Sequence, residues 1–246
     1  MQLGKRITIF TGAFGSGKTE LALNYALQVA KDGFRVALAD LDIVSPYFRS
    51  RDAAARLAVQ GIEVIAPLGE LAQADLPVIV PRVHGALADS ELHVVLDVGG
   101  DDPGATALGQ FSDQLQKLPH AVLLVVNTCR PFTRDLSGIL SMASTIERAA
   151  RLKVTGLIAN SNLGAETTPD IIRAGIARVA EAARALGVPV VAAGVRNDLV
   201  SQVGQLSVPI FPIHIFLLPP WLQTQIIGRD RRAVLATQAR LQGLIQ

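Results

Sequence analysis

The stretch Gly12-Ala-Phe-Gly-Ser-Gly-Lys-Thr19 decides the fold of this chain, because it fits the G-x-x-x-x-G-K-[ST] pattern in full. It follows a strand-like run and opens a helix-like one. Its glycines let the backbone wrap around an anion with N–H groups pointing inward, and the positive end of the next helix adds to the attraction. We predict a loop that binds the phosphates of a nucleotide through Gly12, Gly15, Ser16, Gly17, Lys18 and Thr19.

Two side chains of this loop carry the chemistry. The Lys18 ammonium is expected to reach the β- and γ-phosphates and to stabilise charge during transfer, so we name it as a catalytic residue. The Thr19 hydroxyl is expected to ligate Mg²⁺. Both expectations depend on the loop standing between a strand and a helix, which is the context that the neighbouring sequence provides.

Outward from the loop, short apolar runs alternate with longer helix-like segments. The strand-like runs are 7–10, 36–39, 62–65, 94–96, 122–126, 154–158, 188–191 and 208–215. The helix-like segments lie near 18–31, 47–59, 104–117, 134–151 and 169–186. Nearly continuous apolar strands are typical of a sheet covered on both faces. We therefore predict an α/β fold: a doubly wound, mostly parallel sheet with helices on both faces, in three layers.

Two stretches are less regular. The stretch 67–89 contains Pro67, Pro77 and Pro81, and we expect a loop-rich excursion beside the third strand. The stretch 225–246 reads as a final helix with one apolar stripe. A helix docked on the domain is favoured there over a helix that binds a membrane surface or a partner. No Gly/Ser-rich linker interrupts the chain, so residues 1–246 are predicted to form a single domain.

Composition excludes several classes of function. A formal net charge of +2 is too small to indicate a nucleic-acid partner. Cys129 is the only cysteine, which excludes an intramolecular disulfide and an all-cysteine metal cage within one chain. The longest apolar stretch, 210–222, is broken by prolines and too short to span a bilayer. The first residues lead straight into a strand-like run, so we expect no signal peptide and a cytoplasmic protein.

Carboxylates stand at the ends of two later strand-like runs, where ligands bind in open α/β sheets. Asp40 and Asp42 alternate to the same side of their strand. We predict that Asp42 lies near the γ-phosphate, where it orients the attacking water or the magnesium shell, and that Asp40 supports it; loop-capping carboxylates are the alternative. Asp97 ends an apolar run, as in a Walker B strand, and is predicted to hold Mg²⁺ through water.

The segment after Asp97 has the spacing of a nucleotide sensor. In Asp97-Val-Gly-Gly100, the Gly100 N–H is positioned to meet a γ-phosphate and so to respond to its hydrolysis. Asp101 and Asp102 follow at once. We favour solvated loop charges for this pair over further members of the magnesium network.

The nucleotide base is expected at the end of the sixth strand-like run, where the Asn160 amide can read a purine edge. The guanine-reading pattern N-K-x-D requires Asp three residues after the Asn, and position 163 is Leu. Adenine is therefore favoured over guanine. The alternative for Asn160 is a turn residue without contact to the base.

Taken in order, 12–19, 40–42, 97–100 and Asn160 resemble the MinD/ParA/CobQ-type nucleotide-binding family. The resemblance extends from residue 5 to about residue 215, and the run from Asp40 to Arg51 is similar to a bacterial branch of that family. It implies ATP and Mg²⁺ as ligands and Asp42 as the catalytic carboxylate. It also implies, for many members, a homodimer that sandwiches two nucleotides.

One residue departs from the family pattern. Most MinD and ParA proteins have a second lysine just after the first glycine of the loop, and this chain has Ala13 there. This departure puts the sandwich dimer in doubt, unless another cation replaces the lysine. Arg49 and Arg51 are the candidates for that role, with plain surface arginines as the alternative.

The leading prediction is a Mg²⁺-dependent ATP-binding protein and slow ATPase that acts as a nucleotide switch for a protein partner. One alternative is an ATP-dependent ligase of the dethiobiotin or cobyrinate synthase type, which needs a cationic pocket; Arg49, Arg82 and Arg130 are its candidates. Another is a GTPase of the metallochaperone type, although the Cys/His metal sites of such proteins are not found in the sequence. The last alternative is a protein that binds nucleotide without hydrolysing it.

Overall fold

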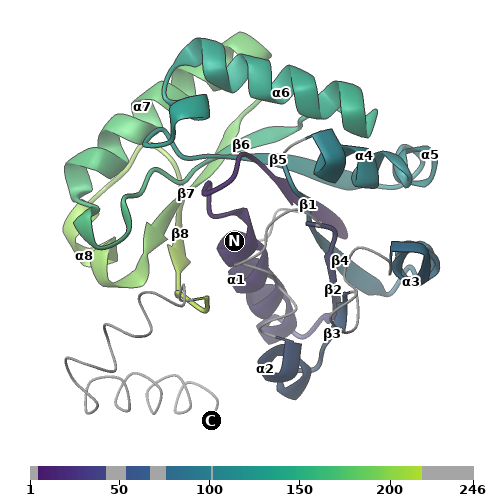
Figure 1. Cartoon of the computed structure of the whole chain (residues 1–246). Helices are drawn as coiled ribbons and strands as arrows, with labels where there is room; N and C mark the ends of the chain where they lie inside the picture. Colours follow the sequence, from purple (N-terminus) through teal and green to yellow (C-terminus); the bar gives the residue numbers. More distant parts are fainter. Residues whose placement is uncertain (1–4, 43–53, 67–75, 101, 218–246) are drawn as a thin grey trace, which may run out of the picture.

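The protein was examined as a computed structural model, which describes residues 5–42, 54–66, 76–100 and 102–217 (Figure 1). These ranges contain one open sheet with the strand order β3-β2-β4-β1-β5-β6-β7-β8, and every pairing in it is parallel. The strands are β1 (Ile7–Thr11), β2 (Arg35–Asp40), β3 (Ile62–Ile65), β4 (Leu92–Asp97), β5 (His120–Val126), β6 (Gly156–Ala159), β7 (Val190–Arg196) and β8 (Ile210–Ile213). The predicted doubly wound α/β fold is confirmed.

Helices cover both faces of this sheet, as Figure 1 shows. The α-helices are α1 (Lys18–Lys31), α2 (Ala54–Val59), α3 (Leu76–Ala88), α4 (Asp102–Gly109), α5 (Ser112–Leu115), α6 (Leu136–Ala150), α7 (Pro169–Leu186) and α8 (Val200–Val203). Three short 3₁₀ turns are η2 (Pro131–Thr133), η3 (Gly164–Glu166) and η4 (Asn197–Leu199). Within these ranges, no helix is long and apolar enough to cross a membrane.

The two faces of the sheet have separate hydrophobic cores. Ile7 and Ile9 of β1 pack into the core that α3 to α7 cover, while Phe10 packs into the core beneath α1 and α2. Successive strand residues point to opposite faces, so an uninterrupted apolar run fills both cores. The three predicted layers follow from this arrangement.

The expectation of a loop-rich excursion over 67–89 is wrong for its second half, because α3 spans Leu76–Ala88 with Pro81 inside it. A proline inside a helix costs about 3 kcal/mol or more. Burying large aliphatic side chains offsets this cost at about 1.5–3 kcal/mol each, and Val83 and Leu87 are completely buried. Tertiary packing therefore outweighs the local signal.

Other boundaries also differ from the sequence-based expectation. The helix expected near 104–117 is two short helices, α4 and α5, with Phe111 at the break between them. The helix expected at 47–59 is described only as α2, from residue 54 onward. The predicted final helix at 225–246 lies outside the described residues.

The register of the strands determines where the loops meet. Asp40 at the end of β2 is paired with Asp97 at the end of β4, and Asp97 is paired with Phe10 of β1. The strand β1 lies between β4 and β5; the chain runs from β1 to β2 on one side of it, and from β4 across to β5 on the other. Ligands bind at such a switch point, outside the carboxyl ends of the strands.

Candidate functional site

The loop after β1 curves tightly because its glycines adopt backbone angles that other residues avoid. Gly12 has φ 152° and Gly17, which caps α1, has φ 86°. A Cβ atom on Gly12 would collide with the carbonyl oxygen of Val125, and one on Gly17 would collide with the Asn160 amide. Only glycine allows the loop to lie so close to the ends of β5 and β6. The loop is thus shaped by the strands beside it.

Lys18 leaves this loop and enters a pocket of carboxylates. Its Nζ atom lies 2.6 Å from Oδ2 of Asp42, and both side chains are almost completely buried. Burial alone would lower the pKa of Lys18, but the charges of Asp97 and Asp42 outweigh it and raise that pKa above 10.5. Lys18 is therefore a buried, firmly charged ammonium group.

Asp40, Asp42 and Asp97, which were predicted from the sequence to belong to the nucleotide and magnesium site, come together around Lys18. Asp42 is 1% exposed and the other two are fully buried. The Asp42 backbone N–H donates to Oδ1 of Asp40 at 3.1 Å, which joins the end of β2 to the residue that follows. Burial, with the nearby negative charges of Asp40 and Asp42, raises the pKa of Asp97 to about 7 against the opposing charge of Lys18. The cluster carries more negative than positive groups.

The residues present fit a magnesium ion that is completed by a nucleotide. The Thr19 hydroxyl hydrogen-bonds with Asp97, so a Walker A hydroxyl and a Walker B carboxylate meet. No three Asp, Glu, His or Cys side chains in the described ranges are placed to hold a metal by themselves. Mg²⁺ commonly keeps several waters and binds through one or two protein oxygens together with substrate phosphates. The donor set here is of that kind.

Gly100 lies directly against the phosphate loop. A Cβ atom at this position would overlap the backbone of Gly12 and lie 2.8 Å from the Ala13 nitrogen. The hydroxyl of Thr11 also donates to the Gly99 carbonyl, at 3.4 Å. The segment after β4 therefore touches the phosphate loop, as the D-x-x-G spacing predicts. Asp101 is outside the described residues, and Asp102 begins α4.

Asn160 reaches the loop rather than open solvent. Its Nδ2 atom donates to the Ser16 carbonyl at 2.7 Å, and a Cβ atom on Gly194 would lie 2.5 Å from its Oδ1 atom. Asn127, at the end of β5, donates to the Gly15 carbonyl at 3.2 Å. Two asparagines from neighbouring strands thus tie the loop to the sheet, a structural role that the sequence alone did not suggest for either residue.

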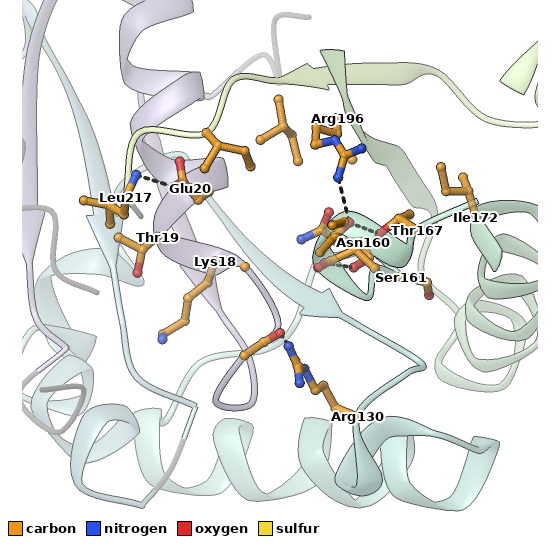
Figure 2. Close-up of a pocket in the computed structure, with 18 of the residues that line it drawn as sticks. Lys18, Thr19, Glu20, Arg130, Asn160, Ser161, Thr167, Ile172, Arg196 and Leu217 are labelled. Atoms are coloured by element: carbon orange, nitrogen blue, oxygen red, sulfur yellow. Dashed lines mark hydrogen bonds between the residues drawn. The ribbon is translucent and has the colours of Figure 1, made fainter. Parts of the chain in front are cut away.

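A cavity of about 590 Å³ opens beside the loop (Figure 2). Gly15, Lys18 and Thr19 line its phosphate end. The other end is lined mainly by apolar residues from α7, β7, β8 and the segment after β8, which include Ile172, Gly194, Ile213, Ile215 and Leu217. Cavities of this size and character bind small molecules and cofactors. Asn160, which was predicted from the sequence to read the base, also lines this cavity.

Three charged residues that line this cavity were not predicted from the sequence to be nucleotide-site residues: Arg130, Glu20 and Arg196. Arg130 donates from Nε to the Gly15 carbonyl at 3.1 Å. Glu20 accepts hydrogen bonds from the backbone after β8, at 2.7 Å from Leu217, and its pKa is raised by burial to about 7. Arg130 directly follows β5, so the rule that ligands gather at strand ends would have indicated it. Glu20 has no such signal except its place next to Thr19.

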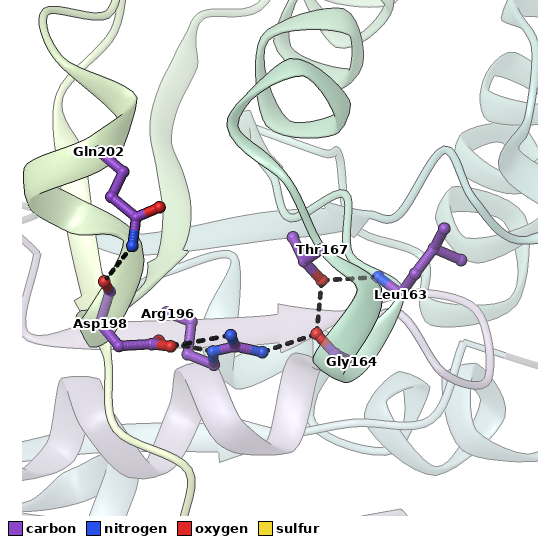
Figure 3. A network of polar contacts seen from close by, with 6 residues as sticks. All are labelled: Leu163, Gly164, Thr167, Arg196, Asp198 and Gln202. Carbon is purple, nitrogen blue, oxygen red and sulfur yellow. Dashed lines mark hydrogen bonds and ion pairs between the residues drawn. The ribbon is translucent and has the colours of Figure 1, made fainter.

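Arg196 braces the apolar end of the cavity (Figure 3). Its guanidinium group bonds both carboxylate oxygens of Asp198, one at 2.8 Å, and donates to the Gly164 carbonyl at 2.6 Å. The Thr167 hydroxyl donates to the same carbonyl at 2.7 Å. The loop after β6 is thereby fastened to the end of β7, and Arg196 is a structural clamp that bonds through Nε and both terminal nitrogens.

Not every predicted cation joins the site. Arg82 lies on α3 and pairs with Glu63 of β3 at 3.0 Å, and it does not line the cavity. Arg49 and Arg51 lie outside the described residues. Of the two described arginines that were considered for a substrate pocket, Arg130 lies beside the phosphate loop and Arg82 does not.

The sequence of this chain matches a model of the CobQ/CobB/MinD/ParA nucleotide binding domain over residues 7–201. That range includes the phosphate loop, the carboxylate cluster and Asn160. No curated protein matches the sequence.

Solved structures share the fold. The cell division protein FtsY from Thermotoga maritima is 25% identical, with a TM-score of 0.54 over 77% of this chain and 61% of that chain. Chloroplast FtsY from Physcomitrella patens is 23% identical, with a TM-score of 0.53 over 77% of this chain and 58% of that one. This chain spans less than two thirds of the length of these relatives.

Proposed function

Because this chain belongs to the CobQ/CobB/MinD/ParA nucleotide-binding family, we propose that it binds ATP with Mg²⁺ and hydrolyses it slowly, as a nucleotide switch. The observation that carries this proposal is the meeting of Lys18, Thr19 and the carboxylates Asp42 and Asp97 at one edge of the sheet. These groups come from three different strand ends, and they adjoin a cavity large enough for a nucleoside. The fold by itself would not require these four side chains to lie close together.

The phosphates would occupy the loop from Gly12 to Thr19. Backbone N–H groups of Gly15, Ser16 and Gly17 would face the phosphate oxygens, and the start of α1 would add its positive end. Lys18 would leave Asp42 for the β- and γ-phosphates. Its raised pKa supports this role, because the group stays charged at neutral pH.

Mg²⁺ would bind to the Thr19 hydroxyl and a phosphate oxygen, with Asp97 and Asp42 in its shell. When bound, the ion neutralises charge that develops on the transferring phosphoryl group. Thr19 and Asp97 already share a hydrogen bond, so their side chains point at a common position. The buried negative charge of the cluster favours a divalent cation there.

Asp42 is the proposed catalytic carboxylate. It stands at the phosphate end next to Lys18, and its backbone is fixed by Asp40. From this position it would orient the attacking water and accept its proton. The Gly100 N–H would contact the γ-phosphate, so that hydrolysis releases the 97–100 segment, and this release would be the switch that a protein partner reads.

Adenine is the proposed base. Guanine offers an N1–H and an N2 amino group, which carboxylates accept in guanine-binding sites. Glu20 is the carboxylate among the described residues that line the cavity, and it accepts from the backbone of Phe216 and Leu217. Asn160 keeps a second amide N–H besides the one that bonds Ser16, and it would donate this N–H to the purine.

The ligase alternative has little support in the cavity, because Arg82 is elsewhere and Arg130 already bonds the loop. For a GTPase of the metallochaperone type, the described residues offer no Cys/His metal cluster. We retain the proposals of a single domain over 1–246, a cytoplasmic location, and a homodimer that depends little on ATP, since Ala13 removes the usual contact across the phosphates.

Equilibrium titration and a phosphate-release assay test this function together. Wild-type protein should bind Mg²⁺-ATP and release phosphate slowly, and Lys18→Ala should bind about ten- to a hundredfold more weakly and release none, since it loses a charge-assisted contact. A pool of small carboxylates should not change the rate. A wild-type protein that binds no ATP would refute the proposal, and stimulation by one carboxylate would favour the ligase.

A further inference from the structure

Glu20 makes contacts that the proposed chemistry does not require. It lies in the first turn of α1, directly after Thr19, and lines the nucleotide cavity. Its Oε1 and Oε2 atoms accept from the Phe216 backbone N–H at 3.1 and 3.0 Å, and Oε1 also accepts from the Leu217 N–H at 2.7 Å (Figure 2). A carboxylate that receives several backbone N–H groups forms strong, charge-assisted hydrogen bonds.

Asn24 repeats this pattern one turn further along α1. Its Nδ2 atom donates to the His214 carbonyl at 2.8 Å, and its Oδ1 atom accepts from the His214 N–H at 2.9 Å. Residues four positions apart lie on the same side of a helix. The side chains of Glu20 and Asn24 therefore hold one continuous segment, 214–217, by its backbone.

This segment depends on α1 for its position. It follows β8, which ends at Ile213, and the pairing between β7 and β8 stops at that residue. Ile215 and Leu217 nonetheless line the cavity, together with the loop residues Gly15 and Gly17. Beyond Ile213, the hydrogen bonds to Glu20 and Asn24 hold the backbone in place of the bonds that join a strand to its neighbour.

We propose that Glu20 is a positioning residue for the nucleoside: it holds the 216–217 backbone so that Ile215 and Leu217 form the apolar wall against which the base packs. This inference rests on the proposed function, and it adds a determinant of affinity for the base end. Glu20 does not act on the phosphates. Its negative charge lies next to Thr19 and repels them, so its benefit to binding must come through the wall.

The proposal separates two ligands that share the same phosphates. Tripolyphosphate with Mg²⁺ occupies only the loop, whereas Mg²⁺-ATP also needs the wall. Glu20→Gln keeps the size of the side chain but removes the charge and turns one acceptor into a donor that faces backbone N–H groups. Calorimetric titration of the full chain at pH 8 should show ATP binding weakened about tenfold, with tripolyphosphate binding unchanged or tighter.

Two further variants complete the experiment. Asn24→Ala should also weaken ATP binding and spare tripolyphosphate, because it releases His214 at the other end of the segment. Glu181→Gln makes the same change of charge at an exposed site on α7 and should alter neither affinity. Tripolyphosphate binding also shows that each variant has a folded loop, and if Glu20→Gln does not fold, Asn24→Ala decides the question.

Each other outcome contradicts the proposal in a distinct way. Equal loss of both ligands would mean that Glu20 supports the phosphate loop. Unchanged ATP binding would mean that the wall does not need Glu20, and tighter ATP binding would mean that Glu20 competes with the base for the 216–217 backbone. A wild-type protein that binds tripolyphosphate but not ATP would refute the proposed function itself.

Discussion

Replacing Asp42 by Asn separates binding from turnover. Asp42 now holds Lys18 at 2.6 Å, and the same ammonium is proposed to bind the phosphates. Asn keeps the shape of the side chain and removes its charge, so Lys18 no longer has to leave an ionised partner. The variant should therefore bind ATP at least as tightly as the wild type, although its hydrolysis should be almost lost.

The size of the gain in binding follows from the contacts of Lys18. A hydrogen bond to a charged group contributes about 1.5–3 kcal/mol. If the bond to Asp42 were the only contact that Lys18 gives up when ATP binds, removing it would raise the affinity for ATP about ten- to a hundredfold. Asp97 and Asp40 also attract this ammonium, so most of its cost of release remains. We expect ATP affinity to rise by a few-fold, and hydrolysis to fall by about a hundredfold through lost positioning and proton transfer.

Binding would be measured by calorimetry with ADP and a non-hydrolysable ATP analogue, and turnover by single-turnover phosphate release. Asp170→Asn is the matched control, because Asp170 pairs with Arg173 at an exposed site on α7. Hydrolysis at the wild-type rate in Asp42→Asn would refute the catalytic role and leave Asp40 or Asp101 as the candidate. A hundredfold loss of ATP affinity would show that Asp42 serves binding.

Three other predictions concern the base, assembly and the core. Excess GTP should displace bound ATP poorly, since no described carboxylate is placed to accept from guanine; displacement at equal concentration would reverse the choice of base. Light scattering should show little change in mass on adding ATP, whereas a clean shift from monomer to dimer would restore the sandwich that Ala13 puts in doubt. Leu87→Ala should lower the free energy of unfolding by about 2–5 kcal/mol, because the side chain of Leu87, on α3, is fully buried; a change under about 0.5 kcal/mol in a urea titration would contradict that packing.

Much of the fold could be predicted because the local signals agree with each other. Apolar runs long enough to fill both cores marked the strands, and the phosphate loop fixed the junction between β1 and α1. The prediction failed at α3, where Pro77 and Pro81 indicate a loop but Val83 and Leu87 gain more by packing on the sheet. A proline is visible in the sequence, while the burial that offsets it depends on the strands that lie beneath.

The residues of the site also divide into those that the sequence marks and those that it does not. Lys18, Thr19, Asp42 and Asp97 could be located because each belongs to a pattern of a few residues next to a strand. The contact between Asn24 and His214 joins residues that are 190 positions apart, and no pattern marks either of them. Glu20 was not predicted, for the same reason. Its role depends on where the chain runs after β8, and the order of the strands decides that position.

The buried charges of the site cost the fold stability, and nucleotide binding would explain why the fold keeps them. Taking Lys18 and three carboxylates out of water costs several kcal/mol per ion, and their mutual attraction offsets this only in part. Positions at the same edge of neighbouring strands, such as Val98 and Val126, are apolar and fully buried, so the sheet does not need charge there. The three carboxylates outnumber the single ammonium group of Lys18, and they lie beside a glycine-rich loop of the kind that binds anions. Mg²⁺ bound to phosphate would bring an anion to Lys18 and a cation to the carboxylates. The groups that cost the apo protein the most stability are therefore the ones that a magnesium nucleotide would neutralise.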